Sequence, residues 1–232
     1  AIKDNLGNTR ILFSSVKPAP IVHTATFEDN TQSSESSTFN NYPAGGNRSS
    51  LELFDHTDFS GSTYTRSNLL HGGSNSVVGI GKSFKVVPGD RLKIEAFAKY
   101  TNLQSGTSGL SNFAAALTSA FGVSSSSTGE AAQAFQALNS FGTFIFVINS
   151  PRRSTPYPKA FVNIVLFDKD YKFLDAAWDQ INGGEQVGVS VKSMHDLLSL
   201  EYVVKEVGYA YVYISNEKPT LVDVYFDDVK LT

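Results

Sequence analysis

The chain has 232 residues, 41% of them hydrophobic and 12% aromatic, which is enough apolar material to fill the core of one large domain. The net charge is −3 and no Lys/Arg cluster is longer than Arg152–Arg153, so the chain has no electrostatic footprint for nucleic acid or an anionic membrane. The absence of Cys excludes disulfides, thiolate nucleophiles and Cys-type zinc sites. No apolar run approaches the length of a membrane helix, so we expect no membrane insertion.

Alternating apolar and polar residues predict strands along most of the chain. The clearest is Arg91–Tyr100, where apolar Leu92 and Ile94 alternate with Lys93 and Glu95. In chain order the expected strands are Arg10–Val16, Ile21–Phe27, Leu51–Phe54, Ser62–Leu70, Ser76–Ile80, Ser83–Val87, Arg91–Tyr100, Gly142–Asn149, Ala160–Phe167, Tyr171–Trp178, Gln186–Val191, Leu200–Glu206, Tyr209–Ser215 and Val222–Leu231.

Three segments interrupt this pattern. Residues 29–50 are polar and rich in Ser and Asn, which predicts a long loop or a mobile excursion. Residues 102–142 contain two Ala-rich segments flanked by Ser and Gly, and the second, Glu130–Phe141, has the apolar spacing of an amphipathic helix. Together with Phe113–Phe121 it predicts a helical hairpin inserted between two strands. Ser193–Leu198 is interpreted as a short turn of helix.

About ten to twelve short strands with one small helical insertion are typical of an all-β protein. The predicted fold class is therefore an antiparallel sandwich of two β-sheets.

Both ends of this predicted sandwich carry short motifs of one family. Ala25-Thr26-Phe27-Glu28 stands near the start, and the last strand contains Phe226-Asp227-Asp228-Val229-Lys230-Leu231. Between them, Val87-Pro88-Gly89-Asp90 precedes an alternating strand. In this order and spacing the motifs resemble the carbohydrate-binding modules of the galactose-binding-like jelly-roll superfamily, over roughly residues 24–232 apart from the insertion. The resemblance implies a jelly-roll β-sandwich and a sugar-binding role.

The same resemblance implies a structural calcium site. In such modules a carboxylate from each end of the chain holds the ion together with backbone carbonyls, and Ca²⁺ prefers six to eight oxygen ligands. Carried over, the ligands are Glu28 and Asp227, with Asp228 as the alternative to Asp227. The competing interpretation is that Asp227 and Asp228 cap a strand and that Glu28 faces water.

A second resemblance lies before this module. Asp4-Asn5-Leu6-Gly7-Asn8-Thr9-Arg10 is similar to the DHLGN(T/V)R motif of Rhs/YD-repeat proteins, with Asn5 in place of the usual His. The resemblance implies that residues 1–19 are a lead-in strand from an Rhs core segment of the kind found in Bacteroidetes, and that residues 20–232 are the jelly-roll module with its insertion at 102–142. An ordinary Asn-Gly-type turn before the next strand is the alternative. Because the chain begins at Ala1 without a signal peptide, we expect it to be a piece of a longer secreted or cell-surface protein.

Aromatic rings are the usual platforms for sugars, because a flat ring stacks on the apolar face of a pyranose. Trp178 is the first candidate, with Gln180, Asp179 and Asn182 nearby to bond hydroxyl groups. A lone Trp in a β protein is often a core residue, which is the competing interpretation. The further ligand-binding candidates are Tyr100, Tyr157 and Tyr171.

Signals for catalysis are weak. The sequence contains no Gly-x-Ser-x-Gly, P-loop or dinucleotide motif, and its four histidines are not at metal-ligand spacing. Four aspartates could supply the carboxylate pair of a glycosidase, although such clusters are typical of solvated turns; they are Asp168, Asp170, Asp175 and Asp179. We therefore expect no catalytic residues and no enzyme activity.

The sequence leaves two functions open. The first is a non-catalytic module that binds a glycan or polysaccharide on a secreted or surface Rhs-like bacterial protein. The second is a structural or adhesive module of the same fold, without a sugar site, whose partner is another protein surface. The position of Trp178, in the core or on an open face, separates the two.

Overall fold

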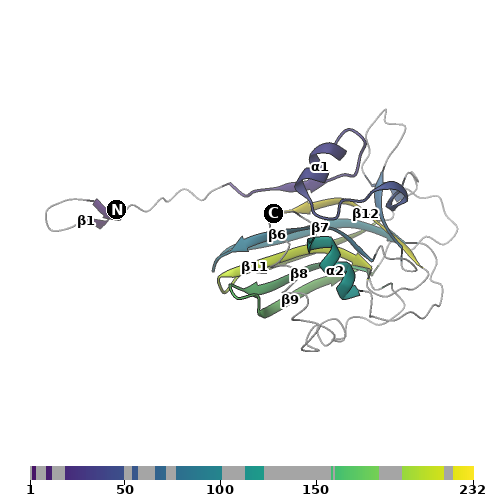
Figure 1. The fold of residues 1–232 in the computed structure, drawn as a ribbon. Helices are drawn as coiled ribbons and strands as arrows, with labels where there is room; N and C mark the ends of the chain where they lie inside the picture. The colour runs from purple at the N-terminus through teal and green to yellow at the C-terminus, as the bar shows by residue number, and fades with distance from the viewer. Residues whose placement is uncertain are drawn as a thin grey trace.

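The structure is a computed structural model of the chain. It describes residues 2–3, 9–11, 19–49, 54–56, 66–71, 77–100, 113–122, 158, 160–182, 195–216 and 222–232. Within these residues the protein is a sandwich of two antiparallel β-sheets (Figure 1). This confirms the predicted fold class.

The larger sheet holds both ends of the module. Its strands run in the order β10-β7-β12-β5-β4, and β3 pairs with the far end of β12. Their bounds are β10 Asp196–Val203, β7 Arg91–Tyr100, β12 Asp223–Leu231, β5 Ser67–His71, β4 Arg48–Ser49 and β3 His23–Ala25.

The smaller sheet has four strands in the order β6-β11-β8-β9. Their bounds are β6 Val78–Val86, β11 Gly208–Asn216, β8 Ala160–Asp168 and β9 Phe173–Gln180. Between β5 and β12 the chain passes repeatedly from one sheet to the other, as in a jelly roll. A separate pair, β1 Ile2–Lys3 and β2 Thr9–Ile11, forms a two-stranded sheet of its own.

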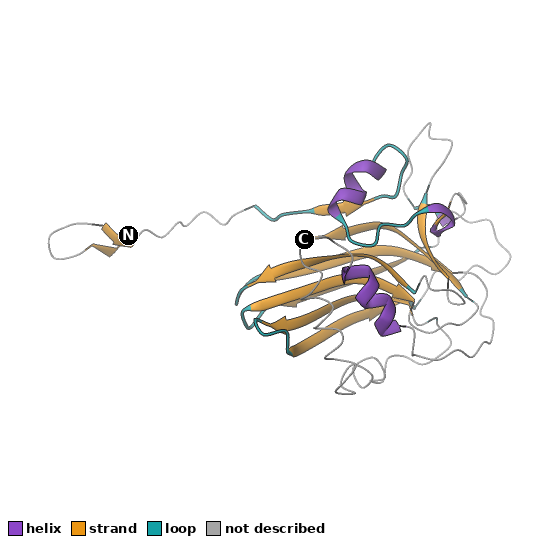
Figure 2. Cartoon of the chain, viewed as in Figure 1, coloured by secondary structure: helices purple, strands orange, loops and turns teal. Residues whose placement is uncertain are grey.

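Among the described residues, three short helices accompany the sheets (Figure 2). The helix α1, Gln32–Thr38, follows β3. A 3-10 turn, η1 Gly45–Asn47, precedes β4. The helix α2, Phe113–Gly122, packs against β6 on the outward face of the four-stranded sheet. No described helix is long and apolar enough to cross a membrane.

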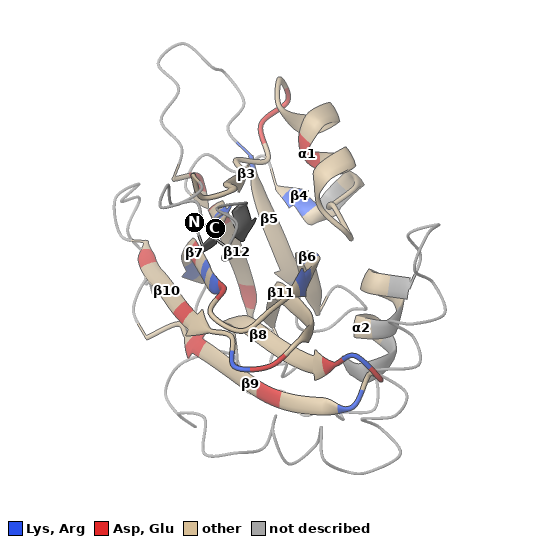
Figure 3. Ribbon diagram, turned by 90° about the vertical axis from the view of Figure 1, so that its left-hand side faces the viewer, with Lys and Arg blue, Asp and Glu red and all other residues tan. Residues whose placement is uncertain are grey.

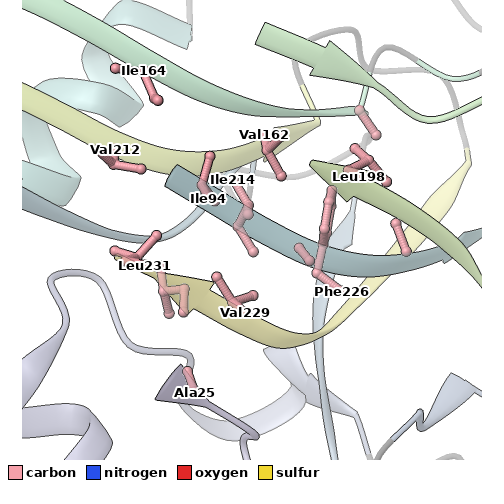
Figure 4. Close-up of a cluster of buried hydrophobic side chains, with 14 of the residues drawn as sticks. Ala25, Ile94, Val162, Ile164, Leu198, Val212, Ile214, Phe226, Val229 and Leu231 are labelled. Carbon is pink, nitrogen blue, oxygen red and sulfur yellow. The ribbon is translucent and has the colours of Figure 1, made fainter. Parts of the chain in front are cut away.

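The main core lies between the two sheets (Figure 4). Alternation decides which side chains enter it, because successive residues of a strand point to opposite faces. In β8, Val162 and Ile164 point inward, and in β11 Val212 and Ile214 meet them. A second apolar cluster lies on the outward face of the four-stranded sheet, beneath α2.

Several sequence expectations agree with these elements, and three do not. The strand Arg91–Tyr100 is observed with the predicted bounds, and the first helix of the insertion is observed as α2. The prediction of a short helix at Ser193–Leu198 is wrong, because Asp196–Leu198 pair with β7 as the start of β10. The expected strands Ser76–Ile80 and Ser83–Val87 are one continuous strand, β6.

The prediction of a long loop over residues 29–50 is also wrong, since this segment contains α1, η1 and β4. Serine hydroxyls inside α1 donate to carbonyls one turn earlier, as Ser37 does to Ser34 at 2.8 Å. Glu35 is the one buried residue of this helix, and it anchors α1 to the chain after β3. A polar composition therefore concealed a segment ordered by hydrogen bonds rather than by apolar packing.

The remaining sequence predictions lie outside the described residues. They are the strand Arg10–Val16 beyond Ile11, most of Leu51–Phe54, Gly142–Asn149 and Gln186–Val191, and the second insertion helix Glu130–Phe141.

Candidate functional site

The outward face of the four-stranded sheet is rich in aromatic residues. In β11, Tyr209, Tyr211 and Tyr213 occupy every second position and point away from the main core. We call these three residues the tyrosine ladder. Sequence reasoning overlooked it, although a Tyr at every second position of a predicted strand signals an aromatic sheet face.

The helix α2 covers part of this ladder. Phe121 contacts Tyr211 edge-on, with ring centroids 5.1 Å apart, and Tyr213 likewise at 5.9 Å. Leu117 and Ala120 join the same buried cluster. Tyr211 also packs on Phe167, and Tyr211 and Tyr213 are only 4% and 2% exposed, whereas Tyr209 is partly exposed.

Trp178 lies on the same outward face, two strands away from the ladder. It belongs to the edge strand β9 and pairs with Asn163 of β8, which in turn pairs with Tyr213 of β11. Asn163 alternates with inward-facing Val162 and Ile164, so this row of residues points away from the main core. Trp178 is partly exposed. The sequence left open whether Trp178 lies in the core or on an open face. The structure places it on the outward face, in the last strand of the four-stranded sheet.

Two amide side chains stand beside Trp178. The Nδ2 group of Asn163 donates to Ser215 Oγ at 2.9 Å, and the Nε2 group of Gln180 donates to the Pro158 carbonyl at 2.9 Å. Both side chains are buried, with exposed fractions of 1% and 7%. Their carbonyl oxygens, Oδ1 of Asn163 and Oε1 of Gln180, have no hydrogen-bond partner within the described part of the chain. Two acceptors on this face therefore have no donor among the described residues.

The other predicted sugar-binding residues are placed differently. Tyr100 is 1% exposed and packs in the core between the sheets, so it presents no open ring face. Tyr171 is partly exposed and stacks on Tyr209, with ring centroids 4.7 Å apart and planes 12° apart. Tyr157 lies outside the described residues.

Two aspartates of β9 hold the two sheets together at one edge. Tyr202 of β10 donates its hydroxyl to Asp175 Oδ2 at 2.7 Å, and Ser199 N–H donates to Asp179 Oδ2 at 2.9 Å. Burial, and then the bond to Asp175, raise the pKa of Tyr202 to about 12. Figure 3 shows the acidic residues along β9 and β10. Both carboxylates are thus engaged in closing the sandwich.

The other two aspartates that were considered as glycosidase candidates lie at the β8–β9 turn. Asp168 Oδ1 accepts the N–H groups of Asp170 and Lys172, each at 2.8 Å. Asp170 is exposed and pairs with Lys169 at 2.9 Å. This is the hydrogen bonding of a solvated turn.

The two ends of the module meet in the six-stranded sheet. Val229 of β12 pairs with Ala25 of β3, so the segment that carries Glu28 follows a strand paired with β12, the strand that contains Asp227. Glu28 is 2% exposed, and its Oε1 accepts the N–H of Arg66 at 2.9 Å. Burial raises the pKa of Glu28, and the negative charge of Asp55 raises it further.

Asp227 and Asp228 have different surroundings. Asp227 is fully buried, and its Oδ2 accepts the N–H of His56 at 2.7 Å. Asp228 is partly exposed, and its Oδ2 lies 2.7 Å from Nδ1 of His56. The His56 ring stacks on Phe97 of β7, with centroids 3.4 Å apart. Of the two sequence alternatives, Asp227 is therefore the buried carboxylate, and Asp228 is the partly exposed one beside the His56 ring.

A cation fits these buried carboxylates in one respect. Glu28, Asp55 and Asp227 are at least 98% buried, and the repulsion between Glu28 and Asp55 is a cost that a positive ion would relieve. Among the described residues, however, no group of three or more acidic or histidine side chains is arranged to hold a metal. Carbonyl oxygens and water would have to complete the coordination shell of a calcium ion here.

Comparison with known proteins identifies distant structural relatives. No protein-family model matches the sequence, and no curated protein matches it. One similar solved structure is a Family 16 Carbohydrate Binding Module-2, with 9% identity and a TM-score of 0.37, covering 80% of this chain and 85% of that one. Another is the CBM22-1 xylan-binding domain of Xyn10C from Paenibacillus barcinonensis, with 13% identity and a TM-score of 0.36, covering 93% and 96%. A cyclase from Fischerella sp. TAU is similar at 10% identity and a TM-score of 0.30, covering 91% and 96%.

Proposed function

We propose that this protein is a non-catalytic carbohydrate-binding module that holds a neutral polysaccharide on the outward face of the four-stranded sheet. The observation that carries the proposal is the group formed by Trp178, Asn163 and Gln180. An aromatic ring on an outward face stands beside two buried amide oxygens that have no donor within the part of the chain that the structure describes. Sugar hydroxyls supply such donors, and the apolar face of a pyranose covers such a ring.

The charges near Trp178 favour a neutral glycan over an acidic one. Asp175 and Asp179 lie in the same strand as Trp178 but on its inward side, where they accept bonds from β10, and Asp196 lies on the adjoining edge of β10. Like charges brought together at a binding surface weaken association. A polysaccharide of uronic acids or sulfated sugars would therefore be repelled along this edge.

A non-catalytic role is supported by the hydrogen bonds of the four aspartates that were considered for catalysis. Asp175 and Asp179 accept bonds from β10, and Asp168 accepts bonds from its own turn. A glycosidase needs one carboxylic acid and one carboxylate facing each other across the scissile bond. These carboxylates instead accept hydrogen bonds that stabilise the fold.

Electrophoresis in gels that contain a dissolved polysaccharide tests the proposal. We expect xylan, glucan or another neutral polymer to retard the wild type and Trp178→Ala to abolish the retardation. Leu197→Ala is the matched control, because Leu197 is 50% exposed on the other sheet and its loss should leave binding intact. If no neutral polymer retards the wild type, or if Trp178→Ala and wild type migrate alike, the proposed site is wrong.

A structural calcium ion at Glu28 and Asp227 belongs to the same proposal. It is supported by the burial of both carboxylates, by the raised pKa of Glu28 and by the β3–β12 pairing, which joins the two ends of the module. Neutralising the buried charge would tie the two ends of the module to each other. The calcium ion would stabilise the fold and would not contact the sugar.

A secreted or cell-surface location on an Rhs-like bacterial protein completes the proposal. It is supported by the motif Asp4–Arg10 and by the resemblance of the module to carbohydrate-binding domains. Immunodetection of the parent protein on intact cells, with and without external protease, tests the location. A signal that resists external protease would contradict it.

One observation favours the second candidate, a structural or adhesive module that binds another protein. The helix α2 covers Tyr211 and Tyr213, which reduces the aromatic surface that is open to a sugar. This candidate predicts that no glycan binds and that substitutions on the outward face leave polysaccharide gels unaffected. The electrophoresis described above therefore separates the two functions.

A further inference from the structure

We infer that α2 is a movable cover of the tyrosine ladder and competes, within the same molecule, with the ligand of the outward sheet face. In the closed arrangement Phe121 occupies the place of a ligand ring above Tyr211 and Tyr213. When α2 moves away, the face extends from Trp178 to the ladder. The competition with glycan rests on the proposed function, but the movement of α2 does not.

The sheet has a built seat for Phe121. The nearest contact to a Cβ placed at Gly81 of β6 would be Phe121 Cζ, at 2.6 Å. A side chain at this position would therefore clash with the phenyl ring of Phe121, as well as with Tyr213 Cβ and the Val212 carbonyl at 2.8 Å. Gly81 pairs with Tyr213, so the seat lies directly beside the ladder.

The surface beneath the cover has the features of a ring-binding platform. Tyr211 and Tyr213 are two residues apart on one strand, so their Cα atoms lie about 7 Å apart on the same face. Asn163 continues the row of Tyr213 toward Trp178. An aromatic row that ends in an amide and a Trp suits a chain of neutral sugar rings that crosses the strands.

The cover is a small part of the structure. Helix α2 has ten residues, which is shorter than an isolated helix needs to persist in water. It carries no charged side chain, and among its described side chains Leu117, Ala120 and Phe121 are buried against the sheet.

The main core does not depend on α2. The cluster between the sheets contains residues of both sheets and none of the helix. The cluster under α2 is a separate group on the opposite face. The helix can therefore leave while the sandwich stays folded, which is the behaviour of a local opening.

Closure would lower the apparent affinity for ligand. When only a fraction of the molecules is open, the apparent Kd equals the intrinsic Kd divided by that fraction. Weakening the seat of Phe121 raises this fraction and so tightens binding. A purely structural helix would have the opposite effect, because its loss would disturb the face.

Hydrogen exchange on the wild-type chain tests the movement without any ligand. We expect the amides of α2 to exchange about a hundredfold faster than those of β8 and β11, at a rate insensitive to low urea. If the amides of α2 and β11 exchange together, α2 opens only when the whole protein unfolds, and the inference is overturned.

Binding of xylohexaose and cellohexaose, followed by calorimetry, tests the competition. We expect Phe121→Ala and Leu117→Ala each to lower the Kd of the ligand that binds by about threefold or more. Leu198→Ala is the matched control, because it removes a buried leucine of the main core and should lower the Tm without lowering the Kd. Weaker or unchanged binding in both α2 variants overturns the competition. If neither sugar binds to any variant, the proposed function fails, and hydrogen exchange still decides whether α2 opens.

Discussion

Glu35 and Phe27 are joined by a hydrogen bond in which the Phe27 N–H donates to Oε2 of Glu35 at 3.0 Å. Oε1 of the same carboxylate accepts the N–H of Thr26 at 2.8 Å, and Tyr42 donates its hydroxyl to Oε2 at 2.9 Å. Phe27 is held at a φ of +62°, a conformation that non-glycine residues rarely adopt. One buried carboxylate thus fixes the bend that precedes Glu28.

Replacing this carboxylate should destabilise the fold. We expect Glu35→Ala to lower the free energy of unfolding by about 2–4 kcal/mol, because two backbone N–H groups lose a charged acceptor. Urea denaturation measures the change. Glu201→Ala removes an exposed carboxylate of β10 and should cost far less. Equal effects of the two substitutions would show that Glu35 does not fix the bend.

Calcium should stabilise the protein through Glu28 and Asp227. We expect calcium at a hundredfold excess over its Kd to raise the free energy of unfolding by about 2.7 kcal/mol, and EDTA to reverse this. The variants Glu28→Gln and Asp227→Asn should each remove the response. Thermal unfolding with calcium or with EDTA measures it.

The control for the calcium experiment is Glu206→Gln, which changes an exposed carboxylate far from the chain ends in sequence. This variant should respond to calcium like the wild type. Identical Tm values for the wild type in calcium and in EDTA would contradict the proposed ion.

His23 should make the protein less stable in mild acid. Its ring lies between Phe39 and Phe84, and burial, followed by the charge of Lys82, lowers its pKa below the ordinary 6.5. The unfolded chain then binds a proton more readily than the folded chain. The stability conferred by neutral His23 is therefore complete above pH 6.5 and is lost as the pH falls from 6.5 toward the lower folded pKa.

The variant His23→Phe tests this pH dependence, because it keeps a ring between Phe39 and Phe84 and removes the titration. We expect urea denaturation to show a smaller loss of stability between pH 7.5 and pH 5 in the variant than in the wild type. Parallel stability curves for the two proteins would contradict the assignment to His23.

The amide oxygens beside Trp178 should contribute to sugar binding. Gln180→Met keeps the length of the side chain and removes both polar groups. We expect it to weaken binding of a neutral oligosaccharide by about tenfold, which equals about 1.4 kcal/mol. Calorimetric titration measures the loss, and Ser83→Ala, an exposed position of β6 on the same face, is the control. If Gln180→Met binds the oligosaccharide as tightly as the wild type, Gln180 does not contribute to the site.

The strands were predictable where one face is buried. In β7 the alternation of Ile94 and Ala96 with charged residues defines both the strand and its inward face, and the observed bounds agree. Helix α2 was likewise visible from its Ala-rich composition. These features depend on the local pattern alone.

The hydrogen-bonded parts of the structure were not predictable in this way. Helix α1 depends on Glu35 meeting Thr26 and Phe27, a contact that a Ser-rich composition does not reveal. Asn163 was overlooked because it lies inside an apolar strand, and only the pairing of β8 with β9 places it beside Trp178. Tyr100 was proposed as a sugar platform, but alternation within β7 puts it in the core with Ile94. The neighbours of these side chains depend on contacts between segments far apart in the sequence, which the local pattern does not show.

Trp178 offers the most direct test of the proposed function, because it is the only Trp of the chain and its fluorescence reports on the site alone. We would titrate the wild-type protein with xylohexaose, cellohexaose and other neutral oligosaccharides and follow the emission and its quenching by acrylamide. A bound sugar should shift the emission to shorter wavelength in a saturable way and protect the ring from the quencher. If a polysaccharide that retards the protein in gels leaves both signals unchanged, the sugar binds elsewhere, and the assignment of the site to Trp178 is wrong.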